Sequence, residues 1–162
     1  MCIRDSLVGL FQQPDLVFID VDFLSTLPFE ELKSGFAEVI KHGAIASEEY
    51  FSFIEKLNLK EITSEELIEV VLGSCRIKSK VVEADEKEHG ERKILNFGHT
   101  IGHAIESLSH YDGKDVLLHG ECVALGMVVE AKIAEYQGLL SKVDSQKLIT
   151  VSYTHLTLPT KA

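Results

Sequence analysis

Three histidines lie close together in the second half of the chain, in a pattern typical of metal ligands. His99 and His103 are four residues apart in the run NFGHTIGHAIE, and His119 follows in the run LHGE. Residues four apart on a helix project from the same face, so the first two imidazoles would lie one turn from each other. Imidazole is the commonest protein ligand for zinc, and catalytic zinc usually takes three protein ligands. The third histidine could therefore complete a divalent-metal site.

An ordinary structural explanation exists for each of these residues. The spacing of His99 and His103 also occurs on solvated helix faces, and His119 alone would be a partly buried polar residue near a helix N-terminus. Gly98 and Gly102 favour a special role for this helix, because glycine in a helix interior costs about 1 kcal/mol. We expect these glycines to allow close approach of a ligand or of another backbone.

Charged residues elsewhere in the chain could contribute to the same site. Glu38 is expected on the polar side of an earlier helix, beside Lys41. A lone glutamate there is most often solvated, yet a carboxylate is also a ligand that completes a two-histidine zinc site. Lys78 and Arg92 add positive charge to an acidic chain, although each alone is typical of a protein surface.

Helices must position most of these residues. Residues 15–20 form a short apolar run, which is typical of a buried strand. The hydrophobic periodicity after that run predicts five helices, at residues 28–43, 47–57, 63–83, 96–108 and 119–137. The fold class is therefore mainly α, with one strand that would be the remnant of a preceding α/β domain.

Local signals predict where several helices begin and end. Thr63 and Glu66 fit a capping box at the start of the third helix, and Asn96 is the expected N-cap of the histidine helix. Gly43 and Gly138 are the expected ends of the first and last helices. The apolar stripe expected to face the core on the histidine helix consists of Ile101, Ala104, Ile105 and Leu108.

Composition limits the class of protein. The 162 residues suffice for one domain with a core, and the net charge of −10 argues against nucleic acid or an anionic membrane as the main partner. The 3 cysteines form no CxxC pair, which fits a reducing, cytoplasmic setting. The longest apolar runs are too short to predict a membrane span, and we expect residues 1–6 not to be a secretory signal. Residues 1–6 and 151–162 look like foreign terminal scars, so we assign no function to His155.

Taken together, these segments resemble the 3-dehydroquinate synthases of the sugar-phosphate cyclase family. The matching stretches are LVGLFQQPDLVFIDVDFLSTLP, SGFAEVIKHGAI, RIKSKVVEADEKEHGERKILNFGHTIGHAIE and LLHGECVALGMVVEA. They cover nearly the whole chain between the suspect ends, and the combination of AEVIK, NFGHTIGHAIE and LHGE is specific to the family. The resemblance implies a truncated chain, in which 7–27 would end the NAD-binding α/β domain and 28–150 would form the multihelical metal- and substrate-binding domain.

The resemblance also implies roles for individual residues. The metal ligands would be Glu38, His99 and His119. Lys41 would lie at the substrate, and His103 would lie near the substrate's phosphate and take part in proton handling. The residues implied to hold the substrate's carboxylate, hydroxyls and phosphate are Lys78, Arg92 and Asn96. The residues implied to contact NAD are Phe23, Leu24, Ser25 and Thr26.

The implied reaction converts 3-deoxy-D-arabino-heptulosonate 7-phosphate into 3-dehydroquinate and phosphate, a lyase step of the shikimate pathway toward chorismate and the aromatic amino acids. NAD would oxidise and later re-reduce the substrate, and zinc or cobalt would act as a Lewis acid. Basic residues suit a small anionic phosphorylated sugar acid. We expect a full-length parent to be a homodimer and this truncated chain alone to be inactive.

Three other functions remain open from the sequence. Another sugar-phosphate cyclase, such as 2-deoxy-scyllo-inosose synthase, would share the metal residues and NAD. A metal-dependent polyol dehydrogenase on a similar scaffold would have no need of the set formed by Lys78, Arg92 and Asn96. A non-catalytic helical module would bind metal without turnover.

Overall fold

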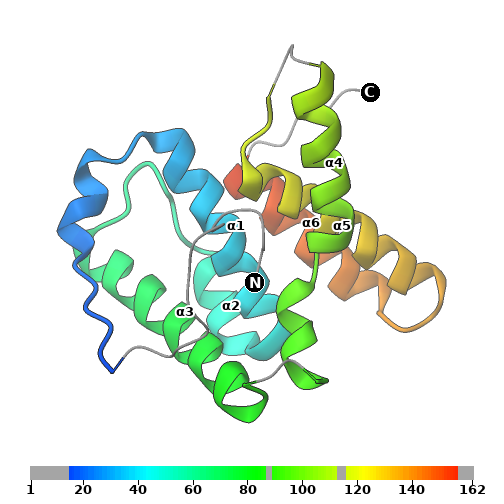
Figure 1. Cartoon of the computed structure of the whole chain (residues 1–162), viewed down its shortest axis with the longest axis horizontal. Coiled ribbons are helices and arrows are strands. Elements are labelled where there is room, and N and C mark those ends of the chain that lie inside the picture. The colour runs from blue at the N-terminus through cyan, green and yellow to red at the C-terminus, as the bar shows by residue number, and fades with distance from the viewer. Residues whose placement is uncertain (1–14, 87–88, 113–115, 157–162) are drawn as a thin grey trace.

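The described part of the computed structural model, residues 15–86, 89–112 and 116–156, is mainly α-helical (Figure 1). It includes no β-strand, which confirms a mainly helical class. The helices are α1 (Phe29–Ala46), α2 (Glu48–Ile54), α3 (Ser64–Ala84), α4 (His99–Asp112), α5 (His119–Tyr136) and α6 (Lys142–Leu156). Two short 3-10 helices, η1 (Val21–Thr26) and η2 (Glu91–Asn96), precede α1 and α4.

The strand predicted at residues 15–20 does not form in the described structure. Its apolar side chains are exposed, and Phe18 keeps 85% of its surface in contact with solvent. A strand needs a neighbouring strand to satisfy its backbone hydrogen bonds, and the described residues supply none. The remnant of an α/β domain therefore stays a prediction.

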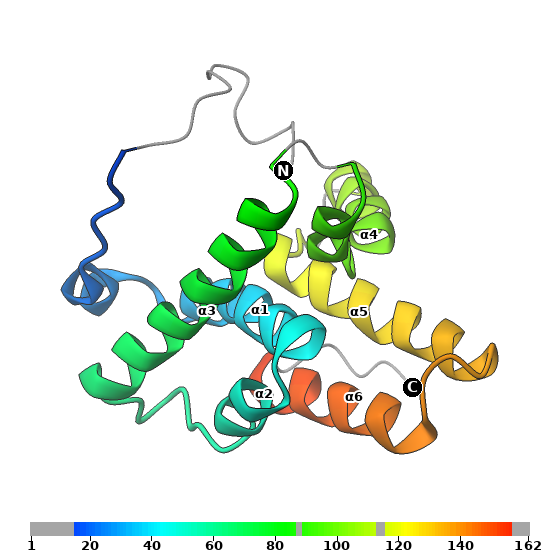
Figure 2. The ribbon, with the colours of Figure 1, turned by 90° about the horizontal axis from the view of Figure 1, so that it is seen from below.

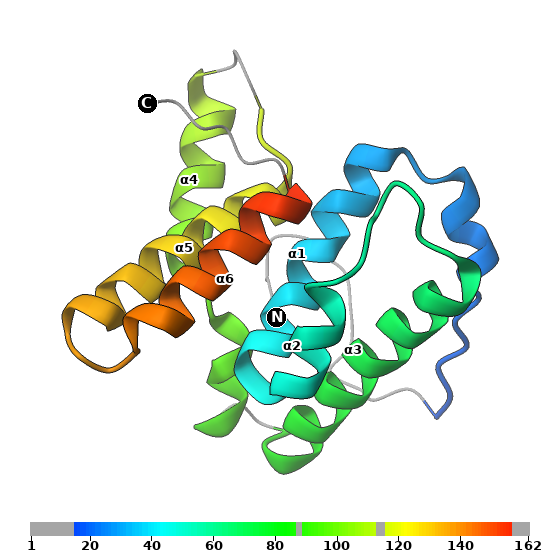
Figure 3. The same cartoon turned by 180° about the vertical axis from the view of Figure 1, so that it is seen from behind.

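Helix α1 lies at the centre of the helical domain and packs against α2, α3, α5 and α6 (Figures 1 and 3). Pro28 precedes its first turn, and the carboxylates of Glu30 and Glu31 interact favourably with the positive end of the helix dipole. Phe36 and Ile40 are buried on its inner face and belong to the core. The helix therefore presents its residues to most of the other elements at once.

Gly43 does not end α1, which continues to Ala46. A Cβ atom at Gly43 would lie 3.1 Å from the backbone of Phe51 and 3.1 Å from the side chain of Ile54. The glycine therefore lets α2 fold back closely onto α1, which is why a residue that resembles a helix stop lies inside the helix.

Helices α5 and α6 form an antiparallel pair, joined by a turn in which Gly138 has a positive φ of 72° (Figure 2). Gly138 thus follows the end of α5, as predicted. Helix α6 was not among the five predicted helices. Its last residues, 151–156, fall in the suspect C-terminal segment, yet His155 is only 5% exposed and packs its ring against Phe36. Whether 151–162 is foreign stays a prediction, and 157–162 lie outside the described residues.

Of the two predicted helix N-caps, one is confirmed and one is wrong. Thr63 and Glu66 form the predicted capping box, in which each side chain accepts a hydrogen bond from the other residue's backbone N–H. Asn96 is not the N-cap of the histidine helix, because it ends η2 and α4 begins at His99. Within the described part of the chain, no helix combines the length and apolarity that a membrane span requires.

Candidate metal centre

Three helices bring together Glu38 from α1, His99 from the start of α4 and His119 from the start of α5. One ligand atom of each residue lies within 4.8 Å of the others. The distance between Glu38 Oε1 and His99 Nε2 is 3.4 Å. In a tetrahedral zinc site with bonds of about 2.1 Å, neighbouring ligand atoms lie about 3.4 Å apart. The donor set and its spacing therefore fit a divalent metal such as zinc.

The two oxygens of the Glu38 carboxylate have different surroundings. Oε2 accepts a hydrogen bond from Lys41 Nζ at 2.5 Å, whereas the buried Oε1 has no hydrogen-bond partner among the described residues. Burial raises the pKa of Glu38, but the charge and hydrogen bond of Lys41, with the charge of His99, outweigh it and hold the pKa below its usual value. Glu38 is therefore ionised, with an unused oxygen directed at the histidine.

The ring of His99 is oriented by its own backbone. Its Nδ1 lies 3.2 Å from the carbonyl oxygen of Phe97, to which it can donate a hydrogen bond. That donation leaves the lone pair on Nε2, the atom that faces Glu38. Burial, together with the positive charge of Lys41, lowers the pKa of His99. A neutral imidazole is the form that binds metal, so these surroundings favour binding.

The close crossing of α4 and α5 positions His99 and His119. A Cβ atom at Gly102 would lie 2.9 Å from the carbonyl oxygen of Cys122, and one at Gly126 would lie 1.9 Å from the carbonyl oxygen of Gly98. Gly98 also has a φ of 78°, which favours glycine. The expected close approach is therefore confirmed, and the partner is the backbone of α5.

The apolar stripe predicted for α4 is only partly correct: its two isoleucines are half-buried, but its other two residues are exposed. Leu108 is 69% exposed and Ala104 is also exposed, whereas Gly98 and Gly102 are buried. Small residues allow the shortest distance between two helix axes, so α4 approaches α5 through its glycines and Leu108 stays outside the contact.

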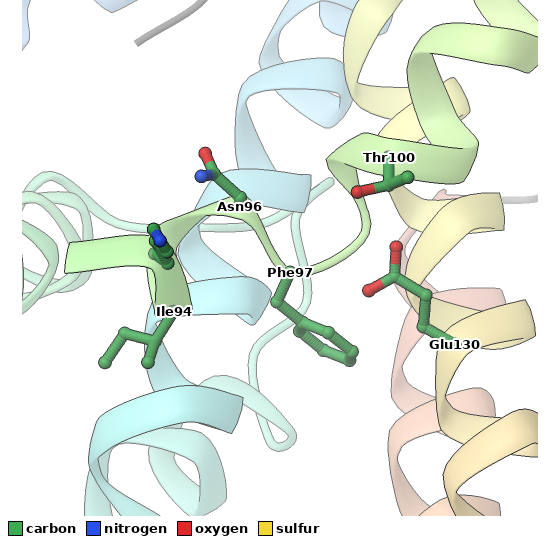
Figure 4. Close-up of a pocket in the computed structure, with 6 residues that line it drawn as sticks. Ile94, Asn96, Phe97, Thr100 and Glu130 are labelled. Atoms are coloured by element: carbon green, nitrogen blue, oxygen red, sulfur yellow. The ribbon is translucent and has the colours of Figure 1, made fainter. Parts of the chain in front are cut away.

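Glu130 on α5 anchors the segment before α4, a role that the sequence did not predict. Its Oε2 accepts a hydrogen bond from the backbone N–H of Gly98 at 2.9 Å. Figure 4 shows its carboxylate directed toward Thr100, with Phe97 and Asn96 on the chain that leads into the helix. The only sequence signal for this role was the presence of a carboxylate in the largely apolar helix α5.

Glu106 is the second functional candidate that sequence analysis missed. Its two carboxylate oxygens lie 3.1 Å from His103 Nδ1 and 3.2 Å from His119 Nδ1. These three residues form a second group whose ligand atoms lie within 4.8 Å of one another, and it shares His119 with the first. Nothing in the sequence pairs Glu106 with His119, because their contact joins α4 to α5 and requires the tertiary structure.

Two of the predicted substrate residues lie near the buried imidazole of His42, whose Nδ1 is 2.6 Å from Ser74 Oγ. Burial, together with the charges of Lys41 and Lys78, lowers the pKa of His42 to about 4. Lys41 belongs to the metal centre through Glu38. Lys78, one turn beyond Ser74 on α3, contributes its charge to the same region.

The other predicted contacts are spread over the surrounding segments. Arg92 on η2 donates from Nη1 to the carbonyl of Glu86 at 2.7 Å, so it is held by its own loop. Asn96 lines the pocket of Figure 4. In η1, Phe23 is 77% exposed, and Ser25 and Thr26 hydrogen-bond to backbone carbonyls of the same turn. The implied contacts of these residues, and of Leu24 beside them, with substrate and NAD stay predictions.

Comparisons with known proteins place the chain in a family. The family model described as 3-dehydroquinate synthase C-terminal matches residues 35–162. The 3-dehydroquinate synthase of Pelotomaculum thermopropionicum is 47% identical over 147 residues, which cover 89% of this chain and 38% of that protein. That of Acetivibrio thermocellus is 46% identical over 160 residues, with 96% and 42% covered. The pentafunctional AROM polypeptide of Scheffersomyces stipitis is 47% identical over 153 residues, which cover 87% of this chain and 10% of that polypeptide.

A solved structure shares the fold. The 2-epi-5-epi-valiolone synthase from Streptomyces hygroscopicus subsp. jinggangensis, solved with NAD+ and Zn2+ bound, superposes with a TM-score of 0.76 at 25% identity. The match covers 89% of this chain and 40% of that one. The chain thus spans about two fifths of the length of the synthases it matches.

Proposed function

The chain belongs to the 3-dehydroquinate synthase family, and we propose that it is the metal- and substrate-binding part of an enzyme that converts 3-deoxy-D-arabino-heptulosonate 7-phosphate into 3-dehydroquinate and phosphate. The observation that carries the proposal is the convergence of Glu38, His99 and His119 at the meeting point of three helices. Identity of about 47% to named synthases supports this reaction over others in the superfamily.

In the proposed site, Glu38, His99 and His119 would hold zinc or cobalt, which suit the same ligands. The bound metal would supply Lewis-acid polarisation of a substrate hydroxyl. Lys41 neutralises the Glu38 oxygen that would not bind the metal, and its charge also favours an anionic substrate. The residues proposed to bind the substrate's carboxylate, hydroxyls and phosphate are Lys78, Arg92 and Asn96.

His103 is the proposed proton-handling residue. It is one helical turn from His99, with 5.5 Å between the ring centroids, and its side chain is 35% exposed. A partly exposed imidazole beside a metal centre can exchange a proton with a bound substrate and with solvent. Its ring is also held by Glu106, so its orientation does not depend on substrate.

The NAD-dependent part of the proposal concerns the N-terminal residues. Phe23, Leu24, Ser25 and Thr26 of η1 are proposed to contact NAD at the edge of an α/β domain that would include 7–27. The extended apolar segment at 15–20 would pack within that domain, which accounts for its exposure here. NAD supplies reversible hydride transfer when it is bound.

We further propose that a full-length protein of this type is a cytoplasmic homodimer. The support for the compartment is the cysteine usage: Cys75 and Cys122 are unpaired thiols in the described structure. Sedimentation of a full-length form would test the dimer.

Metal content and affinity of the purified chain test the proposed site. Wild-type protein is expected to bind one equivalent of zinc, and Glu38→Gln, His99→Ala and His119→Ala are each expected to lose it. His110→Ala, which removes an exposed imidazole from the last turn of α4, is the matched control and should bind like wild type. Equal zinc binding by the three ligand variants would overturn the assignment.

The isolated chain is proposed to have little or no synthase activity, because it holds the metal residues without a complete NAD-binding domain. Release of phosphate from the heptulosonate in the presence of NAD and zinc is the assay, and near-native turnover would contradict the proposal. A second candidate, another sugar-phosphate cyclase, is favoured only by the fold shared with the valiolone synthase. If a full-length form converted a different sugar phosphate and not the heptulosonate, that result would support this second candidate.

A further inference from the structure

The two carboxylate oxygens of Glu106 contact two different histidines. Oε2 lies 3.1 Å from His103 Nδ1, and Oε1 lies 3.2 Å from His119 Nδ1. The ring centroids of His103 and His119 are 5.6 Å apart, so a single carboxylate spans the space between them. The Glu106 side chain is 21% exposed and the two histidine side chains are 35% and 36% exposed. The bridge is therefore partly shielded from water.

An ionised carboxylate can only accept hydrogen bonds, so each contact requires a proton on the facing imidazole nitrogen. A glutamate carboxyl with an ordinary pKa of about 4.3 is ionised at neutral pH. A neutral imidazole carries one N–H, and a proton on Nδ1 leaves the lone pair on Nε2. Both rings are then committed to the same tautomer.

We propose that Glu106 is a positioning residue that fixes the tautomer and ring orientation of His119 as a metal ligand and of His103 as the proton-handling group. The proposal rests on the proposed function for what the two rings do. A carboxylate behind a metal-binding imidazole also raises its basicity as a ligand. The carbonyl oxygen of Phe97 accepts from Nδ1 of His99 in the same way. Both histidines of the metal centre would therefore offer Nε2 to the metal.

The same three residues could instead form a second metal site, because their ligand atoms also lie within 4.8 Å of one another. The two sites share His119, and a metal bound to its Nδ1 would displace the hydrogen bond to Glu106. Distances of 3.1 and 3.2 Å from nitrogen to oxygen are normal for N–H donors, which favours the bridge over the second site.

Tautomer measurement on metal-free protein tests the bridge without relying on zinc. Long-range nitrogen–proton spectra of labelled imidazoles would be recorded with chelator at about pH 8, above the usual histidine pKa of about 6.5. His103 and His119 are both expected to carry their proton on Nδ1. In Glu106→Gln the amide can accept from one ring only and must donate to the other, so one ring is expected to change tautomer. Nε2 protonation of either ring in wild type would overturn the proposal.

Zinc affinity then tests the consequence for the metal centre. Glu106→Gln is expected to weaken zinc binding about 10- to 100-fold while one equivalent still binds. Glu135→Gln, which removes one carboxylate from the far end of α5 with Lys132 as its partner, is the control and should bind like wild type. Two equivalents in wild type falling to one in Glu106→Gln would show a second metal site and overturn the bridge. If the ligand variants lost zinc while Glu106→Gln kept wild-type affinity, the metal site would stand and the positioning role of Glu106 would be overturned.

Discussion

The backbone N–H of Gly120 donates a hydrogen bond to the hydroxyl oxygen of Ser34 at 3.0 Å, where α5 begins against α1. A Cβ atom at Gly120 would lie 1.9 Å from the carbonyl oxygen of Ser34, so no other residue fits without movement of a helix. His119 immediately precedes this contact, and Glu38 is one turn beyond Ser34. The crossing therefore determines the distance between two of the proposed metal ligands.

Gly120→Ala is expected to destabilise the protein by about 1–3 kcal/mol or more, because the added methyl group overlaps backbone that cannot move alone. Zinc affinity should fall as well, since α5 must shift away from α1. Denaturant unfolding and a zinc titration measure the two effects. Gly35→Ala is the matched control: its Cβ would meet nothing within 4 Å, and a gain of about 0.5–1 kcal/mol is expected in the helix. Similar stability of both variants would contradict the tight crossing.

His42 is expected to make stability depend on pH. Its pKa is lowered from 6.5 to about 4 in the folded protein by burial, with the charge of Lys41 as a further cause. Between these values the unfolded chain binds more protons, so stability is lost as the pH falls from 6.5 to about 4 and does not depend on this group above or below that window. The loss is at most about 3 kcal/mol.

The measurement is the free energy of unfolding across that pH range for wild type and His42→Asn. Asparagine can keep a hydrogen bond to Ser74 but does not titrate, so the variant should show a shallower pH dependence. Parallel curves for the two proteins would show that His42 is not the group responsible.

Removal of metal is expected to lower the melting temperature of zinc-loaded protein. A ligand that binds only the folded state stabilises it by about 2.7 kcal/mol at a free concentration 100 times the dissociation constant. Chelator should reverse this gain in wild type and have no effect on His99→Ala, whose Nε2 would no longer be available. Scanning calorimetry with zinc and with chelator measures both. An equal zinc-dependent shift in His99→Ala would place the binding elsewhere.

The capping box of α3 gives a prediction that is independent of the metal centre. Thr63→Ala is expected to destabilise the protein by about 1 kcal/mol, because it removes the acceptor for the backbone N–H of Glu66. Ser64→Ala, at the next position and exposed, is the control and should change stability by less than about 0.5 kcal/mol. Chemical denaturation of the two variants is the measurement, and equal effects would argue against the cap.

The exposed N-terminal segment should contribute little to the stability of this chain. Phe18 is 85% exposed, so Phe18→Ser is expected to leave the unfolding free energy within about 0.5 kcal/mol and to reduce self-association. Phe36→Ala, in the core at 3% exposure, should cost about 3–5 kcal/mol. Sedimentation velocity and unfolding curves measure these effects. A large loss of stability in Phe18→Ser would mean that the segment is packed in solution.

Local signals in the sequence predicted five of the six α-helices of the described residues, because periodicity and caps act within a few residues of the chain. The capping box at Thr63, the end of α5 before Gly138 and the close approach at Gly98 and Gly102 all follow from such signals. The sequence was less informative where one residue type can serve either a helix end or a close packing contact. Gly43 resembles a helix stop but lies inside α1, because a packing contact with α2 requires the small side chain.

By itself, the sequence determined the helical class, the family resemblance and the residue types that could bind a metal. Only the tertiary structure decided that Glu38 and His99, 61 positions apart in the chain, face each other at 3.4 Å. It also decided that Glu106 holds two histidines and that α4 packs through its glycines rather than through Leu108. The physical reason is that a metal centre depends on distances between helices, and those distances are set by side-chain volumes at crossings distant in sequence.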